Sequence, residues 1–376
     1  MCVAIVVASG VGSRMGADNP KQFVEVYGKP FFFYTLQAFQ FHSSVVLRIL
    51  YMGLFSKVKF VINVPHRVYD WYMNSSRRIA FGRWGHPTYY LIRVEYSTAG
   101  LMAIAKSTLQ HIIFAEEKSY VPIVDLKTCR CQYHGPGEVN KVNVWNRFFC
   151  QPAGVEVDDI PPHSGVVQSA KWLTPTKRHF IDVDLILPRN RDKLTRVAKQ
   201  FYKWIRFSPE VDAVLSREYE QFRSFCGEEK VLGVLCRGTD YLQLRPAWHP
   251  VQPEPSDVVE KVREICEKFE IKHIFLATED YSIRKMFEAS FPDEILPNSQ
   301  RLIKLGEKKY LSEVQKDGQS YFDDPVRYLV AIYILSRCNF FVGGRTSGSL
   351  FAFLMSPTRG FEYEYVFDMG NYPGRC

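Results

Sequence analysis

"VLGVLCRGTDY" (residues 231–241) is a short apolar run that ends abruptly in polar residues. Its first five residues have the length and the aliphatic side chains of a buried β-strand. The polar residues that follow are Arg237, Thr239, Asp240 and Tyr241. Arginine supplies a guanidinium, threonine and tyrosine supply hydroxyls, and aspartate supplies a carboxylate. Ligands of open parallel sheets bind beyond the carboxyl ends of the strands. This stretch therefore predicts a strand that ends at a ligand-binding site.

The same pattern occurs twice more toward the C-terminus. "HIFLATED" (273–280) and "NFFVGGRTSGS" (339–349) each consist of an apolar run followed by polar residues. Strands that alternate with helices predict a parallel, doubly wound α/β domain, which we expect over residues 206–376. The polar residues at these two further strand ends are Thr278, Glu279, Asp280, Arg345, Thr346, Ser347 and Gly348.

Helices are expected between these strands. Residues 254–269 and 323–338 carry apolar side chains at helical spacing. Asp324 is the expected N-cap of the second helix, with Pro325 at its first helical position.

An α/β segment is also expected upstream, over residues 85–205. Residues 89–96 and 121–126 have the pattern of strands, and 100–119 between them has the spacing of a helix. Such a strand–helix–strand unit implies a second parallel sheet. Residues 1–75 form a separate N-terminal segment.

The three polar strand ends together favour a ligand that is both anionic and sugar-bearing. Residues 345–349 begin a helix, where free N–H groups and the helix dipole attract an anion. The guanidinium of Arg237 can bind two phosphate oxygens at once. A carboxylate such as Asp280 can accept a hydrogen bond from a sugar hydroxyl. The combination predicts a nucleotide-sugar site.

Each of these features also has a purely structural interpretation. Arg237 could simply pair with Asp240 within its loop. Residues 277–280 could be a helix N-cap, and 343–349 could be a tight turn between a strand and a helix. Their common position after successive strands is what favours a site.

Composition excludes some classes of function. The net charge is +8 over 376 residues, but basic and acidic residues are interspersed, so no nucleic-acid surface is expected. A mild positive excess suits phosphate-bearing substrates, or docking at an anionic membrane surface. The nine cysteines include no CxxC pair and no metal-ligand cluster, so reduced thiols, a cytoplasmic location, no bound metal and no cofactor are expected. Residues 45–62 contain three basic residues and make a poor membrane span.

Four stretches of the chain are similar to one known family. "VLGVLCRGTDY" (231–241), "HPVQP" (249–253), "HIFLATED" (273–280) and "YILSRCNFFVGGRTSGSLFAFL" (333–354) resemble the fucosyltransferase-like glycosyltransferases. The resemblance runs from about residue 88 to residue 376. It implies a GT-B fold, with two Rossmann-like domains and a cleft between them. It also implies a nucleotide-sugar donor, with GDP-fucose as the expected one, a glycan or lipid-linked glycan as acceptor, and no metal.

The same resemblance implies roles for individual residues. Arg237 would hold the donor diphosphate, Asp240 would shape its loop, and His249 matches a histidine of the α1,6 group. Asp240, His249 or Glu279 could serve as the general base. The other polar strand-end residues would line the donor pocket, and Gly100 would approach the acceptor. Two positions depart from the family pattern, because Leu235 replaces a histidine and Gly238 replaces an arginine.

The N-terminal segment resembles a different family. "VVASGVGSRMGADNPKQF" (6–23) is similar to the methylerythritol phosphate and ribitol phosphate cytidylyltransferases. The resemblance implies a partial α/β nucleotidyltransferase-like segment that ends near residue 75. Its loop would wrap the CTP phosphates through Gly10, Gly12, Ser13, Arg14 and Lys21. The later acidic residues of such enzymes have no identified counterpart, so we expect a truncated, vestigial segment.

Three functions are compatible with the sequence. The first is transfer of a sugar, with fucose as the candidate, from a nucleotide-sugar to a surface glycan or polysaccharide precursor, by a metal-independent enzyme in the cytoplasm or at the inner face of the membrane. The second is CTP-dependent cytidylyl transfer to a sugar-alcohol phosphate. The third is nucleotide-sugar binding without catalysis.

Overall fold

The computed structural model describes residues 25–26, 29–30, 77–80, 82, 85–95, 98–169, 175–237, 239–304, 320–356 and 360–374. The chain divides into two compact units, Met1–Ser75 and Ser76–Cys376. In the first unit the described strands β1 (Glu25–Val26) and β2 (Lys29–Pro30) pair antiparallel. The expected phosphate loop from Gly10 to Lys21 lies outside the described residues.

The first sheet of the second unit, Ser76–Cys376, has the strand order β3-β6-β4-β5. Its strands are β3 (Arg77–Ala80), β4 (Thr88–Ile92), β5 (Val121–Val124) and β6 (Gly165–Gln168). β4 runs parallel to β5 and β6, whereas β3 is antiparallel to β6. Helix α3 (Leu101–Glu117) connects β4 to β5 and packs on both. The strand–helix–strand unit predicted from the sequence is therefore confirmed, with shorter strands than expected.

The second sheet of this unit has the order β10-β9-β7-β8, and all of its strands are parallel. The strands are β7 (Val231–Leu235), β8 (His273–Ala277), β9 (Phe340–Gly344) and β10 (Tyr363–Phe367). The sequence predicts the first three strands but not β10. Parallel strands put their carboxyl ends at one edge of the sheet, so the three polar strand ends lie on the same side.

Both faces of the second sheet are covered by helices, as in a doubly wound fold. One face packs on α8 (Pro255–Phe269) and α9 (Tyr281–Ser290) through alternate strand residues such as Leu232 and Ile274. The other face packs on α6 (Pro209–Cys226), α10 (Ser320–Leu335) and α11 (Ser347–Met355). The mixed α/β class expected of a GT-B fold is thus confirmed, with one all-parallel sheet and one sheet that is parallel except for β3.

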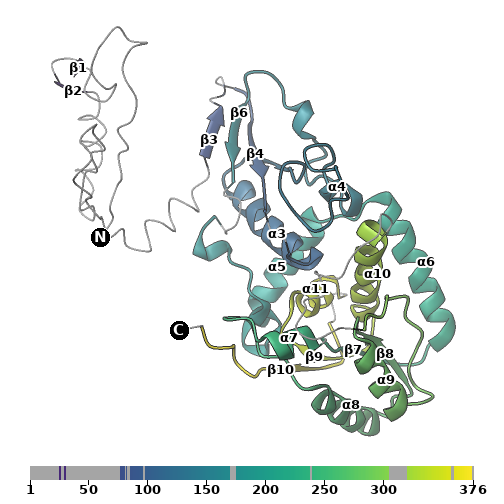
Figure 1. Ribbon diagram of the computed structural model, residues 1–376. Coiled ribbons are helices and arrows are strands. Elements are labelled where there is room, and N and C mark those ends of the chain that lie inside the picture. The colour runs from purple at the N-terminus through teal and green to yellow at the C-terminus, as the bar shows by residue number, and fades with distance from the viewer. Residues whose placement is uncertain are drawn as a thin grey trace. The chain divides into compact units, whose positions relative to one another are not determined.

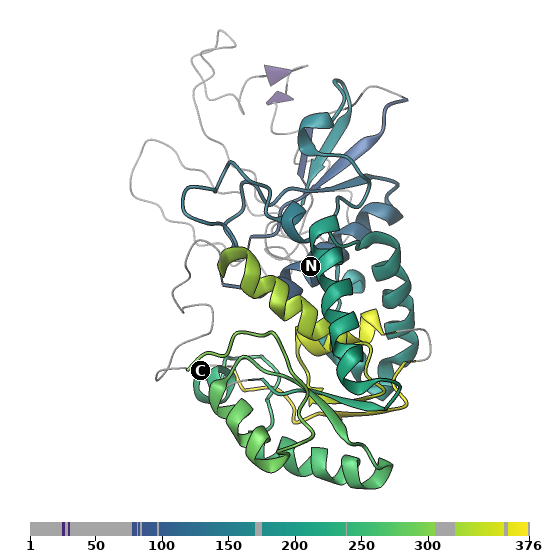
Figure 2. The ribbon, with the colours of Figure 1, turned by 90° about the vertical axis from the view of Figure 1, so that its right-hand side faces the viewer.

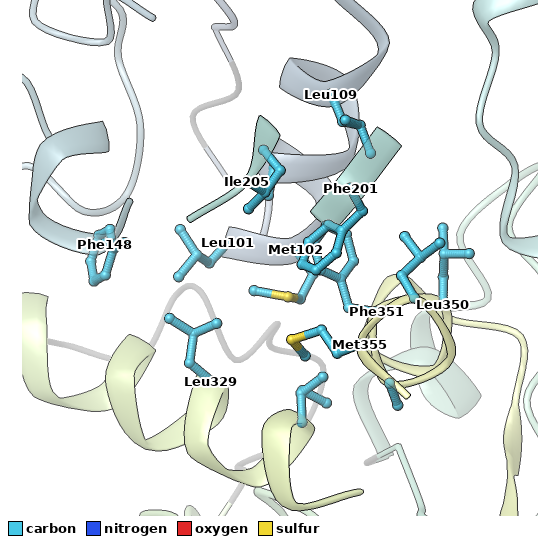
Figure 3. Close-up of a cluster of buried hydrophobic side chains, with 14 of the residues drawn as sticks. Leu101, Met102, Leu109, Phe148, Phe201, Ile205, Leu329, Leu350, Phe351 and Met355 are labelled. Carbon is cyan, nitrogen blue, oxygen red and sulfur yellow. The ribbon is translucent and has the colours of Figure 1, made fainter. Parts of the chain in front are cut away.

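One apolar core continues from the first sheet to the second. α10 and α11 lie between the two sheets (Figures 1 and 2). Figure 3 shows Leu101 and Met102 of α3 facing Leu329 of α10 and Phe351 and Met355 of α11, and all five side chains are buried. Burying a side chain of this size contributes about 1.5–3 kcal/mol. The first turn of α3 is thereby fixed against the second half.

The remaining described elements connect or flank the two sheets. α5 (Arg191–Trp204) packs on α3 and α11. The short segments are α4 (Trp145–Phe148), α7 (Thr239–Leu244) and the 3-10 turns Val157–Asp159, Lys177–His179, Val183–Ile186 and Pro188–Asn190. Each cysteine in the described ranges is a thiol. Within those ranges, no helix combines the length and the apolar character that a membrane crossing requires.

One predicted helix start is wrong. The sequence predicts that Asp324 caps a helix beginning at Pro325, but α10 begins at Ser320 and contains both residues. Asp324 instead lies 3.2 Å from Arg301, oxygen to nitrogen. Pro325 lacks an N–H and so leaves one helical hydrogen bond unmade.

Candidate functional site

A pocket of about 1060 Å³ opens at the carboxyl edge of the second sheet. Its walls come from both halves of the unit, since Gly100 and Lys106 lie on one side and Arg237 and Thr346 on the other. Pockets for a single small ligand usually measure about 300–1,000 Å³. The volume therefore leaves room for more than one small substrate.

Arg237 lies just beyond β7 and lines this pocket. About a quarter of its side chain is exposed, and its carbon Cζ lies 5.0 Å from the centre of the Tyr241 ring. Its Nη1 is 3.9 Å from Oε2 of Glu279, which follows β8. The structure therefore brings the ends of two different strands together around one guanidinium.

The start of α11 forms the next part of the wall, through Thr346, Ser347 and Gly348. Thr346 is the N-cap, and its Oγ1 accepts a hydrogen bond from the N–H of Ser349 at 3.0 Å. The N–H groups at the start of a helix have no partner within the helix, and the dipole there favours negative charge. A Cβ at Gly348 would come within 2.4 Å of the Tyr328 hydroxyl, which explains the glycine at this point.

Arg345 lines the pocket and also forms ion pairs that the sequence does not predict. Its backbone lines the pocket region, but its side chain is buried and forms ion pairs: Nη1 lies 2.6 Å from Oδ1 of Asp184, and Nε lies 3.3 Å from Oδ1 of Asp368. The same guanidinium donates to Oδ1 of Asn371 at 2.9 Å and to the carbonyl of Gly370. Arg345 thus joins the β9–α11 turn to the Val183–Ile186 turn and to the C-terminal segment. These contacts hold the Arg345 guanidinium between two carboxylates at the pocket, and its donor-binding role stays a prediction.

Three polar residues directly follow β8, and of these Glu279 lines the large pocket, whereas Thr278 and Asp280 do not. Thr278 is buried and lines a small adjoining cavity that also contacts Arg237. Asp280 is buried and caps α9, where its Oδ1 accepts hydrogen bonds from the N–H groups of Ser282 and Ile283. The structural interpretation of residues 277–280 as a helix cap therefore holds for Asp280.

His249 lines the pocket together with Tyr241, and its Nδ1 is 3.4 Å from the Tyr241 hydroxyl. The pKa of His249 is lowered, first by loss of hydration in the pocket and second by the positive charge of Lys106. A lowered pKa leaves the imidazole neutral near pH 7, as a proton acceptor must be. Thr239 and Asp240 begin α7, and their side chains, like Gly238, lie outside the described residues.

The opposite wall contains residues that the sequence analysis did not single out. Lys106 and Asp182 both line the pocket. Burial lowers the pKa of Lys106, and the charge of Asp182 opposes that change. Tyr133 and Tyr328 also line it, and burial raises the pKa of each, with Glu279 raising both further. Gly100 lies at the same wall, where it is the N-cap of α3.

A metal would need a cluster of suitable ligands. Among the residues that the structure describes, no group of three or more His, Cys, Asp or Glu side chains has the arrangement to hold one. The described pocket is lined by basic side chains, hydroxyls, a histidine and the start of a helix, together with carboxylates such as Asp182 and Glu279. The basic groups and the helix start suit an anion, and the carboxylates can accept hydrogen bonds from its hydroxyl groups.

Comparison with known proteins gives two separate matches. Residues 2–59 match the family described as 2-C-methyl-D-erythritol 4-phosphate cytidylyltransferase. The ribitol-5-phosphate cytidylyltransferase of Lacticaseibacillus paracasei is 53% identical over 45 residues, which are 12% of this chain and 19% of that protein. The 2-C-methyl-D-erythritol 4-phosphate cytidylyltransferase of Clostridium perfringens is 53% identical over 38 residues, 10% of this chain and 17% of that protein. The chain thus spans about a fifth of the length of these curated relatives.

The similar solved structures are fucosyltransferases. The fucosyltransferase NodZ from Bradyrhizobium has 16% sequence identity and a TM-score of 0.42, and the match covers 72% of this chain and 94% of that one. A structure of POFUT1 in complex with GDP-fucose has 11% identity and a TM-score of 0.34, over 75% of this chain and 74% of that one. The family matched by residues 2–59 is the one that residues 6–23 resemble.

Proposed function

We propose that residues 76–376 form a glycosyltransferase that moves a sugar from a nucleotide-sugar to a glycan or lipid-linked glycan. The observation that carries the proposal is the position of Arg237, beyond β7 in a pocket of about 1060 Å³ that it shares with the start of α11. A guanidinium and free helical N–H groups are donors that a diphosphate accepts. GDP-fucose is the first donor to test, because residues 231–241 and 333–354 resemble the fucosyltransferase-like family.

In the proposed reaction, an acceptor hydroxyl oxygen attacks the anomeric carbon of the donor sugar with inversion. The bond from that carbon to the diphosphate oxygen breaks, and the nucleoside diphosphate leaves. Arg237 and the N–H groups of Ser347 and Gly348 stabilise the negative charge that develops on it. The hydroxyl proton passes to the neutral imidazole of His249, and Glu279 remains the alternative base.

A thermal-shift screen of the full-length chain tests this proposal. We expect GDP and GDP-fucose to raise the melting temperature, since a ligand at about 100 times its Kd adds about 2.7 kcal/mol of stability. Arg237→Ala should abolish the shift. Arg217→Ala, on the exposed side of α6 and outside the pocket, should retain it.

The other outcomes of the screen distinguish the alternatives. A shift with UDP-sugars but not with guanine nucleotides would keep glycosyl transfer and change the donor. No shift with any nucleotide-sugar would contradict the proposal. Donor binding with neither sugar transfer nor donor hydrolysis would make the chain a nucleotide-sugar binding protein.

A second candidate function is supported by the match of residues 2–59 to the cytidylyltransferase family. Those residues contain Arg14 and Lys21, which would contact a triphosphate. Nucleotidyl transfer also requires a held Mg²⁺ and a pocket for the sugar-alcohol phosphate. We therefore propose glycosyl transfer as the function, and cytidylyl transfer as a candidate that pyrophosphate release would reveal.

A further inference from the structure

We propose that Phe180 and Trp248 form the subsite that holds the acceptor sugar, an inference that rests on the proposed function. Both side chains line the pocket, and they are 45% and 76% exposed. Among the exposed large hydrophobic side chains of the described ranges, these two alone line the pocket. Rings of this size are usually largely buried, so two exposed ones in a pocket indicate a ligand that covers them.

The two rings line the same pocket as the candidate base. Trp248 directly precedes His249, and Phe180 lies two residues before Asp182. Lys106 interacts electrostatically with both Asp182 and His249, which places these groups near one another. A sugar bound at Phe180 and Trp248 would therefore share the pocket with the group that would accept its proton.

The backbone holds Trp248 in a conformation that bulky residues rarely adopt. Its φ is +66°, and for a residue of this size such a value is an outlier that neighbouring contacts must maintain. The N–H of Trp248 donates to the carbonyl of Tyr372 at 3.1 Å, and the N–H of Tyr372 donates to the carbonyl of His249 at 2.9 Å. The indole also packs so closely on Gly374 that a Cβ there would lie 2.4 Å from Cζ2. The exposed ring is thus held in place.

A neutral sugar fits these features better than a second anion does. A pyranose ring presents C–H groups on one face, which pack against an aromatic ring, while its hydroxyls stay at the edge and remain hydrated. Arg237 and Ser347 form the proposed donor end, and the charge of Lys106, which also lines the pocket, is opposed by that of Asp182. The pocket volume leaves space beyond a single ligand. The subsite would therefore select the acceptor by the apolar face of its sugar.

The experiment uses the full-length chain labelled with 5-fluorotryptophan and saturated with GDP. The ¹⁹F resonance of Trp248 is assigned from the spectrum of Trp248→Phe. Methyl glycosides of glucose, galactose, mannose and N-acetylglucosamine are then added up to their solubility limits. We expect at least one glycoside to shift the Trp248 resonance, and Phe180→Ala to weaken that binding about tenfold, as is typical when an aromatic contact is removed.

A matched control is Phe225→Ala, which removes an exposed ring from α6 outside the pocket and should leave the titration unchanged. GDP binding should be the same in Phe180→Ala, Trp248→Phe and the wild type. If no glycoside shifts the resonance, or if the shift is as strong in Phe180→Ala as in wild type, the subsite is contradicted while the donor site stands. Failure of GDP to bind the wild type would instead contradict the proposed function.

Discussion

His249 and Lys106 come from opposite walls of the pocket, and their interaction affects the charge of the candidate base. Burial, and then the charge of Lys106, lower the pKa of His249. Its imidazole therefore stays neutral down to a lower pH than that of an ordinary histidine, whose pKa is about 6.5. Transfer should therefore stay constant as pH falls from 8 to about 6.5 and decline only below that value. A pH profile of kcat/KM measures this.

Lys106→Gln should move that decline to higher pH, because removing the positive charge makes the imidazole easier to protonate. Lys199→Gln, on the exposed side of α5, is the control and should leave the profile unchanged. His249→Asn should lower kcat by about 10²–10⁴-fold, the usual contribution of a general base. A wild-type activity that already declines as the pH falls toward 7 would show that another group is the base. An active His249→Asn enzyme with the same pH profile would show the same.

At the residue scale, the sequence predicts the pocket wall built from the strand ends of the second sheet better than the opposite wall. Arg237, Glu279 and Thr346 follow strands of one parallel sheet, so strand order alone brings them to one edge. Lys106 lies within the helical pattern of 100–119, where nothing distinguishes it from a solvent-exposed lysine. Its position in the pocket depends on how α3 packs against α11, and no local pattern carries that information.

At the scale of elements, the start of α11 depends on how closely α10 approaches it. A Cβ at position 348 would lie 2.4 Å from the Tyr328 hydroxyl and 3.1 Å from Cδ1 of Ile332. Gly348→Ala should therefore lower the free energy of unfolding by about 1–3 kcal/mol, the usual cost of overpacking, and weaken GDP binding. Chemical denaturation and GDP titration measure the two effects.

Tyr328→Phe removes the hydroxyl and should recover part of both losses in the double variant. The control is Gly360→Ala in a region where no atom lies within 4 Å of the added Cβ, although its φ of +66° adds backbone strain. That variant should lose stability without losing GDP affinity. Equal effects of Gly348→Ala with and without the Tyr328 hydroxyl would refute the steric explanation.

The boundaries of the helices and strands show how far the sequence patterns predict the structure. The strand β7 and the helix α3 fall where their apolar patterns predict. The start of α10 does not, because proline statistics favour the first helical turn, whereas α10 begins five residues before Pro325. β10, "YEYVF" (363–367), is a partly buried edge strand without the long apolar run that marks β7, β8 and β9.

At the scale of the whole unit, Arg345 connects the halves that form the pocket. Arg345→Met would leave Asp184 and Asp368 without their buried cation. We expect a loss of stability near the lower end of the roughly 3–5 kcal/mol seen when a buried pair is broken, since about a third of each carboxylate side chain is exposed.

Arg189→Met is the matched control, because Arg189 also pairs with Asp368, at 3.1 Å, but is 62% exposed. It should cost less than about 1 kcal/mol. Similar losses for the two variants would contradict the connecting role of Arg345.

The N-terminal segment requires its own test. Residues 2–59 match a cytidylyltransferase family, yet we expect Lys21→Ala to leave sugar transfer unchanged, because the proposed donor site is built from residues of the unit Ser76–Cys376. The full-length chain is incubated with CTP, Mg²⁺ and either methylerythritol phosphate or ribitol phosphate, and pyrophosphate release is followed. We predict none. Release that depends on Lys21 would make the chain bifunctional.

The most direct test of the central claim is the release of GDP from GDP-fucose by the full-length chain in excess EDTA. We predict that the wild type and Arg217→Ala release GDP at equal rates. Arg237→Ala and Arg237→Lys should be slower by about 10²-fold or more. Alanine removes the guanidinium that would stabilise the leaving diphosphate, and the point charge of lysine does not replace its fork. Turnover near the wild-type rate in either Arg237 variant, or activity that EDTA abolishes and Mg²⁺ or Mn²⁺ restores, would contradict the account.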